Sequence, residues 1–154
     1  ANDGVSGLEL WRTDGTPGGT VQVADIFPVP ANGYQQEQAP LGARLLFNAD
    51  DSVHDEALWI SDGSPVGTYL LADLDPTSDG YPENMVSTGQ RVFFTANNAD
   101  HQMRLWVSDG TTATVAYDPN LAGPNSPNTL VAGQTGVSKA TAFTTRSGIQ
   151  RMRV

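Results

Sequence analysis

The sequence predicts an all-β, β-propeller-like protein of about three four-stranded blades of ~48 residues plus an extra N-terminal strand. Three observations lead to this fold class: a recurring motif, about four strand-like segments per repeat, and adjacent apolar residues within those segments. The motif reads LWRTDGT at 10–16, LWISDGS at 58–64 and LWVSDGT at 105–111. Trp11, Trp59 and Trp106 are therefore 48 and 47 residues apart. Such a period is typical of solenoids and propellers, in which each unit buries its apolar surface on its neighbours.

The strand-like segments follow one another in the same order in each repeat. A segment of high β-propensity after the motif (20–26, 68–74, 114–117) ends near Pro28, Pro76 or Pro119, because proline cannot donate to a sheet ladder. A weaker strand (39–41, 84–87, 129–131) leads through Gly42, Gly89 or Gly133 to a strongly apolar strand (44–47, 91–95, 141–144). The Leu-Trp strand comes last, and its eroded copy lies at 150–154. We divide the single repeat domain, 1–154, into the last strand of a preceding blade (1–16), repeat 1 (17–63), repeat 2 (64–110) and a degenerate terminal repeat (111–154).

The apolar pairs within the strands distinguish between β architectures. Neighbouring residues of a strand point to opposite faces, so Leu46-Phe47 and Phe93-Phe94 require both faces of each sheet to be covered. A two-sheet sandwich would show cleaner alternation, whereas blades stacked around an axis cover both faces. A right-handed β-helix remains the main rival. The propeller interpretation predicts that Trp59 and Phe93 are buried between blades.

The number of repeats, and the position within a repeat at which the sequence opens, predict an incomplete ring. Closed propellers have roughly four to eight blades, and three repeats are too few. The chain opens at Ala1 within a repeat, so we expect either a segment of a longer protein or a ring completed by several copies. Other protein subunits or copies of this chain are therefore the predicted partners.

Composition narrows the classes of partner. The 154 residues carry a net charge of −9, which argues against nucleic acid and anionic membranes. No apolar run approaches the ~18 residues of a membrane span, so no membrane insertion is predicted. Cysteine is absent, which excludes disulfides and thiolate metal sites. All 17 acidic residues lie in 1–118, whereas four of the eight basic residues lie in 119–154. This asymmetry could serve end-to-end contacts.

The segment ELWRTDGTPGGT at 9–20 resembles the ELWxxDGT-repeat family of bacterial proteins, and ALWISDGSPVGT at 57–68 is nearly as similar. The following Ala72-Asp73-Leu74 and the Phe-Phe strand match the pattern too, so the resemblance covers nearly the whole chain. It implies a large repeat protein, secreted or displayed on the bacterial surface, with a propeller-like fold. The family supplies no defined activity. The third copy departs from the pattern, because it lacks the glycine before Thr114 and a tryptophan in its last strand.

The recurring Asp-Gly pairs have two interpretations. Carboxylates repeated around a ring could bind cations or sugars, but Asp-Gly followed by Thr or Ser is also a turn in which Asp accepts backbone N–H groups and Gly supplies positive φ. Recurrence in every repeat favours a structural role. The predicted structural positions are Trp11, Asp14, Gly15, Trp59, Asp62, Gly63, Trp106, Asp109 and Gly110.

Other candidate ligand residues lie in the loops. Three aspartates precede Gly80, namely Asp73, Asp75 and Asp79. Their carboxylate oxygens are donors that Ca²⁺ prefers, although their spacing does not match that of an EF-hand loop. A variable polar loop is the alternative, and no cofactor other than this possible Ca²⁺ is predicted. His54 and His101 each stand five residues before a tryptophan, where they could bind metal or simply occupy an exposed loop.

No catalytic motif is present, so the predicted function is a non-catalytic extracellular repeat module that acts as a scaffold, adhesion or protein-interaction surface. A glycan-binding propeller is the first alternative, with Tyr34 and Tyr81 in equivalent turns stacking on sugar rings. A polysaccharide-active enzyme that uses carboxylates of a central funnel is the second.

Overall fold

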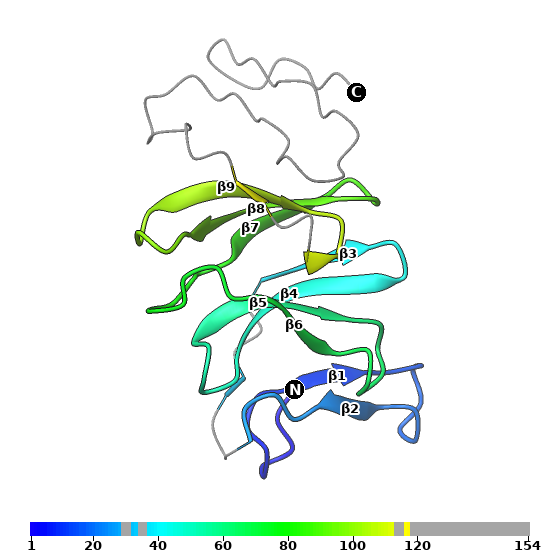
Figure 1. Ribbon diagram of the computed structural model, residues 1–154. Helices are drawn as coiled ribbons and strands as arrows, with labels where there is room; N and C mark the ends of the chain where they lie inside the picture. The colour runs from blue at the N-terminus through cyan, green and yellow to red at the C-terminus, as the bar shows by residue number, and fades with distance from the viewer. Residues whose placement is uncertain (29–31, 34–36, 113–115, 118–154) are drawn as a thin grey trace.

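The computed structural model describes residues 1–28, 32–33, 37–112 and 116–117, and in these the protein is all-β with three antiparallel sheets stacked one upon another (Figure 1). The first sheet contains β1 (Leu10–Arg12) and β2 (Val21–Ala24). The second has the order β3 (Gln38–Leu41), β4 (Arg44–Asp50), β5 (Glu56–Ser61) and β6 (Tyr69–Ala72). The third contains β7 (Glu83–Ser87), β8 (Val92–Asn97), β9 (Met103–Ser108) and β10 (Ala116–Tyr117).

The sheets are offset from the predicted repeats. Repeat 1, 17–63, was expected to form one blade, but β2 pairs with β1 across the predicted boundary at 16/17. The same offset recurs at the next boundary, because β6 pairs with β5. The reason is local: an Asp-Gly turn joins sequential antiparallel strands as a hairpin, whereas the proline-containing segments after Ala24 and Ala72 lead to the next sheet. Most of the predicted terminal repeat lies outside the described residues.

Strand register is the same in equivalent places of the second and third sheets. Phe47 lies opposite Trp59, and Phe94 lies opposite Trp106. The register of β5 against β6 shifts between Leu58 and Trp59, and that of β1 against β2 shifts between Leu10 and Trp11. β1 and β2 therefore occupy the places that β5 and β6 hold in the second sheet.

Among the described residues, the core consists of two apolar layers, one on each face of the second sheet. Side chains of Phe47, Ala49, Ala57 and Trp59 pack with Ile26, which follows β2. On the opposite face, a cluster that includes Leu46, Leu58 and Ile60 packs against Val92, Phe94 and Trp106 of the third sheet. Consecutive residues of β4 and β5 thus enter different layers, because strand side chains alternate between faces.

Burial distinguishes the two phenylalanines of β8. Phe94 is 1% exposed and Trp106 is 6% exposed. Phe93, which we expected to be buried, is only half-buried. The alternation of side chains explains this correction, since Phe94 faces the second sheet and Phe93 faces away from it. Trp59, at 9% exposed, lies between sheets as expected.

Candidate functional site

The Asp-Gly pairs close the same hydrogen-bonded turn in all three copies. Asp62 Oδ1 accepts hydrogen bonds from Ser64 N at 2.8 Å and Ser64 Oγ at 2.6 Å. Gly63 has a φ of 86°, which disfavours any residue with a Cβ, and its N–H donates to Ser61 Oγ. The corresponding bonds link Asp14 to Thr16, and Asp109 to Thr111. These hydrogen bonds lower the pKa of Asp62, with the Ser64 hydroxyl as the largest cause.

A second glycine in each of the first two turns provides space for the aspartate. A Cβ at Gly67 would collide with the Asp62 carboxylate, and one at Gly19 would collide with that of Asp14. Thr68 completes the turn, because its hydroxyl donates to Ser64 O at 2.7 Å. The Gly-Thr pairs at 19–20 and 67–68 therefore belong to the same turns as the Asp-Gly pairs that precede them.

The Asp62 turn allows a test by paired substitutions. We expect Asp62→Asn to leave the urea midpoint nearly unchanged at neutral pH, because the amide oxygen accepts the same hydrogen bonds. Any stabilisation due to the charge is present above the ordinary Asp pKa and is lost as the pH falls through the lowered folded-state pKa, so the two proteins converge in acid.

Gly67→Ala should lower the midpoint, because the new Cβ displaces the carboxylate from Ser64. In an Asp62→Ala background, Gly67→Ala should lower the urea midpoint much less. Additive losses in this double-mutant cycle would contradict the turn interpretation.

Two of the three candidate calcium ligands, Asp75 and Asp79, have different partners. Asp75 is 1% exposed; its Oδ2 lies 2.6 Å from His101 Nδ1, and its Oδ1 accepts from Thr77 Oγ1. Asp79 accepts from Glu56 N and from the Tyr81 hydroxyl. Burial raises the pKa of Asp73. Within the described ranges, no three Asp, Glu or His side chains come close enough to hold one metal ion.

The segment around Asp79 is a connector between sheets, which sequence reasoning missed. Gly80 N donates to Glu56 O at 2.9 Å, and Gly80 O accepts from Asn97 N at 2.7 Å, so one glycine joins β5 to β8. Gly33 makes the equivalent bonds to Leu8 and Asp50. A Cβ at Gly80 would lie 2.9 Å from the Glu56 carbonyl oxygen. The signal in the sequence was Asn32-Gly33-Tyr34 returning as Asp79-Gly80-Tyr81.

Glu9 is a second residue whose structural role the sequence motifs did not predict. Its side chain is 1% exposed, and its carboxylate accepts from Ile26 N at 3.0 Å and Phe27 N at 3.4 Å. Burial raises the pKa of this carboxyl group. The equivalent positions hold Ala57 and Arg104, so this bond between β1 and the segment after β2 is particular to the first sheet.

Tyr81 is the exposed aromatic residue of the connector. It is 41% exposed and has a φ of 46°, and its hydroxyl donates to Asp79 Oδ2 at 2.9 Å. That hydrogen bond is the main reason that the pKa of Tyr81 is raised. Tyr34, the other tyrosine of the predicted pair, lies outside the described residues.

The two histidines have different acidic partners. His54 Nδ1 lies 2.8 Å from Asp51 Oδ2 in its own loop, and this contact raises the pKa of His54. His101 instead contacts Asp75 in the connector. The loops are nevertheless related, because Asp3, Asp51 and Asn98 each accept a hydrogen bond from the backbone N–H two residues further along the chain.

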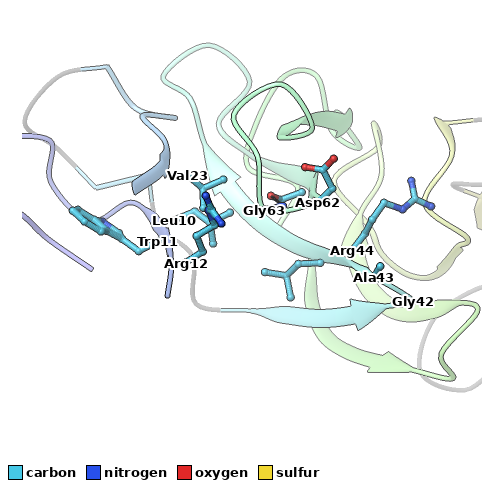
Figure 2. A pocket seen from close by; sticks show the side chains of 11 residues that line it. Leu10, Trp11, Arg12, Val23, Gly42, Ala43, Arg44, Asp62 and Gly63 are labelled. Carbon is cyan, nitrogen blue, oxygen red and sulfur yellow. Dashed lines mark hydrogen bonds between the residues drawn. The ribbon is translucent and has the colours of Figure 1, made fainter. Parts of the chain in front are cut away.

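A pocket of about 320 Å³ lies beside β1, between the first sheet and the β3–β4 hairpin (Figure 2). One side is formed by Leu10, Trp11, Arg12 and Val23. The other is formed by 42–45 and 61–63. Among the described residues that line it, Asp62 is the one carboxylate, and it accepts a hydrogen bond from Ser64 N.

The described residues form an all-β fold of three antiparallel sheets, in which polar residues such as Asp62 and Asp79 form turns and connectors. Comparison with known protein families, characterised proteins and solved structures finds no match to this chain. No helix in the described part of the chain has the length and apolar character needed to cross a membrane.

Proposed function

We propose that this chain is a non-catalytic β-propeller repeat module of a secreted or surface-displayed bacterial protein, in which it serves as a scaffold and a protein-interaction surface. The propeller arrangement is supported by the stacking of three sheets, with Phe47-Trp59 and Phe94-Trp106 at equivalent places. The ELWxxDGT resemblance supports the location outside the cell. The acidic composition is compatible with a soluble surface module.

The observation that carries the non-catalytic function is how the recurring polar residues are used. Asp14 and Asp62 accept hydrogen bonds within their own turns. Asn32 and Asp79 accept from the backbone N–H groups of Leu8 and Glu56, respectively. Polar side chains that hydrogen-bond to the backbone of their own repeat stabilise the fold, and they are engaged in these bonds instead of being presented as reactive groups.

The enzyme alternative has less support. Glycoside hydrolysis by the usual route requires two carboxyl groups facing one cleft. The pocket beside β1 contains the single carboxylate of Asp62. Asp75 is buried against His101, which leaves it poorly placed to meet a substrate.

Glycan binding has one specific observation in its favour. Tyr81 is exposed, and its hydroxyl is fixed by Asp79, so the ring is positioned before any ligand arrives. Such pre-organisation lowers the entropic cost of binding. We keep this as the second candidate function.

A binding experiment with the full chain distinguishes these functions. With one population immobilised, we expect saturable binding of the same chain from solution, which weakens with added salt because the two halves differ in charge. We expect no release of reducing ends from polysaccharides. Glycan-array binding that Tyr81→Ala abolishes but Tyr69→Ala retains would favour the lectin function, since Tyr69 is similarly exposed at 45%. Absence of chain-on-chain binding would overturn the scaffold proposal.

A further inference from the structure

One end of the second and third sheets carries most of their negative charge. The segments 50–56, 73–83 and 97–104 lie together at this end, where the backbone of Gly80 hydrogen-bonds to both of the other segments. Figure 1 shows the three segments on the same side of the stack. They hold nine acidic residues and one arginine, Arg104, which donates a hydrogen bond to the side chain of its neighbour Gln102. We call this region the acidic end.

The opposite end of the same two sheets is balanced in charge. Its described turns, 41–44, 61–68, 87–91 and 108–112, hold two aspartates and two arginines. The negative charge of the two sheets is therefore concentrated at one end, where it attracts cationic partners and sets the orientation in which they approach.

An exposed aromatic ring lies within the acidic end. Tyr81 is 41% exposed, although the next residue, Pro82, is fully buried. The Tyr81 hydroxyl donates to Asp79 Oδ2 at 2.9 Å, and Asp79 Oδ1 accepts from Glu56 N at 3.2 Å. The ring is thus held by its hydroxyl and by the buried proline beside it. A ring that is fixed before binding loses little conformational entropy when a partner arrives.

Two further carboxylates, those of Glu56 and Glu83, act on this ring. The hydrogen bond to Asp79 is the largest cause of the raised pKa of Tyr81, and the charges of Glu56 and Glu83 raise it further. Burial raises the pKa of Glu56, and the charges of Asp79 and Glu83 add to that effect. The four side chains therefore form one electrostatic group, which we call the Tyr81 site.

The carboxylates of the Tyr81 site have no cation of their own. The two histidines of the acidic end contact Asp51 and Asp75 instead. Among the described residues, no Lys, Arg or His side chain forms an ion pair with Glu56 or Glu83. A cation bound beside them would relieve the repulsion between like charges, because an opposite charge favours the ionised form of each carboxyl group.

The arrangement fits a guanidinium better than other cations. Within the described ranges, no three acidic or histidine side chains come close enough to hold one metal ion. A guanidinium is larger and planar, so it stacks on an aromatic face while its N–H groups donate to separate carboxylates. A lysine ammonium is a compact, strongly hydrated point charge that cannot stack in this way.

We propose that the Tyr81 site binds an arginine side chain of a partner protein, with the guanidinium stacked on the Tyr81 ring and hydrogen-bonded to the carboxylates of Glu56 and Glu83. This inference rests on the proposed protein-interaction function and names the chemistry of the partner. A protein fits better than a free small cation, because Val53 and Met103 at the same end are 76% and 48% exposed and offer further apolar contact area. Tyr, Met and Arg are enriched at protein interfaces.

Peptide binding to the full chain tests the site. The probe is a fluorescent peptide in which arginine alternates with glycine, and the reference is the same peptide with lysine in place of arginine. Fluorescence anisotropy measures both affinities at about 0.15 M salt, where attraction between distant exposed charges is largely screened. The urea midpoint of each variant checks that it is folded.

We expect the arginine peptide to bind more tightly than the lysine peptide. Tyr81→Leu should weaken binding of the arginine peptide roughly two- to fivefold, the effect of one exposed cation–π contact. Tyr81→Phe should retain more affinity than Tyr81→Leu, because it keeps the ring. Glu83→Gln should weaken binding by about the same factor as Tyr81→Leu.

Two variants are matched controls. Tyr69→Leu replaces a tyrosine that is 45% exposed on β6, and it should leave binding of the arginine peptide unchanged. Asp62→Asn removes the same charge as Glu83→Gln, but at the balanced end of the sheets, and it should also have no effect.

Three results would overturn the proposal. The first is failure of the arginine peptide to bind. The second is an equal loss of affinity in Glu83→Gln and Asp62→Asn, which would show general attraction by net charge. The third is glycan binding that depends on Tyr81 and persists in the presence of the arginine peptide, which would assign the ring to sugars. Chain-on-chain binding that persists alongside any of these results would leave the scaffold function standing and reject the Tyr81 site alone.

Discussion

Replacement of Trp59 by alanine is expected to lower the free energy of unfolding by about 3–5 kcal/mol, the range for large aromatic truncations in cores. Trp59 is 9% exposed and packs in the layer between the first and second sheets with Phe47 and Ile26. Loss of its side chain would leave a cavity that the flanking strands cannot fill, because their hydrogen bonds hold them in place. Urea denaturation followed by circular dichroism measures the effect.

The indole nitrogens provide a matched control. Trp106 Nε1 donates to Ala96 O at 3.0 Å, whereas Trp59 Nε1 is buried with no acceptor among the described residues. Trp106→Phe should therefore lower the free energy of unfolding by about 1 kcal/mol more than Trp59→Phe does, because one hydrogen bond contributes about that much net stability. A Trp59→Ala protein as stable as the original would show that Trp59 is not a core residue.

Replacement of Phe94 by alanine should have an effect of similar size, about 3–5 kcal/mol. Phe94 is 1% exposed, and its ring is stacked with that of Trp106 at a centroid distance of 6.4 Å and an interplanar angle of 10°. It belongs to the layer between the second and third sheets. The loss removes both apolar burial and an aromatic contact.

Phe93→Ala is the comparison for this site, because the two residues are adjacent and chemically identical. Phe93 is half-buried on the opposite face of β8, so its truncation should cost clearly less. The same urea experiment measures both variants. An equal or larger effect of Phe93→Ala would mean that β8 presents the other face to the second sheet.

For the candidate sites, residue types alone predicted local contacts but not contacts between residues distant in the sequence. Asp73, Asp75 and Asp79 have the donor chemistry of a calcium loop, but Asp75 and Asp79 are engaged by His101 and Glu56 N, respectively. The partner His101 lies 26 residues from Asp75 along the chain, and no local pattern predicts such a contact. The turn role of Asp62 was predictable, because its partners Gly63 and Ser64 are adjacent and the geometry of such turns is local.

The sequence by itself determined the all-β class, the approximate strand positions and the need to cover both faces of each sheet. These follow from local β-propensity, from turn chemistry and from apolar pairs such as Leu46-Phe47, which all depend on neighbouring residues. Only the tertiary structure decided which strands share a sheet, which of Phe93 and Phe94 enters the core, and how Gly80 joins Glu56 to Asn97. Each of these depends on contacts between residues distant in sequence, and a repeat of about 48 residues gives the same local pattern wherever its sheets begin.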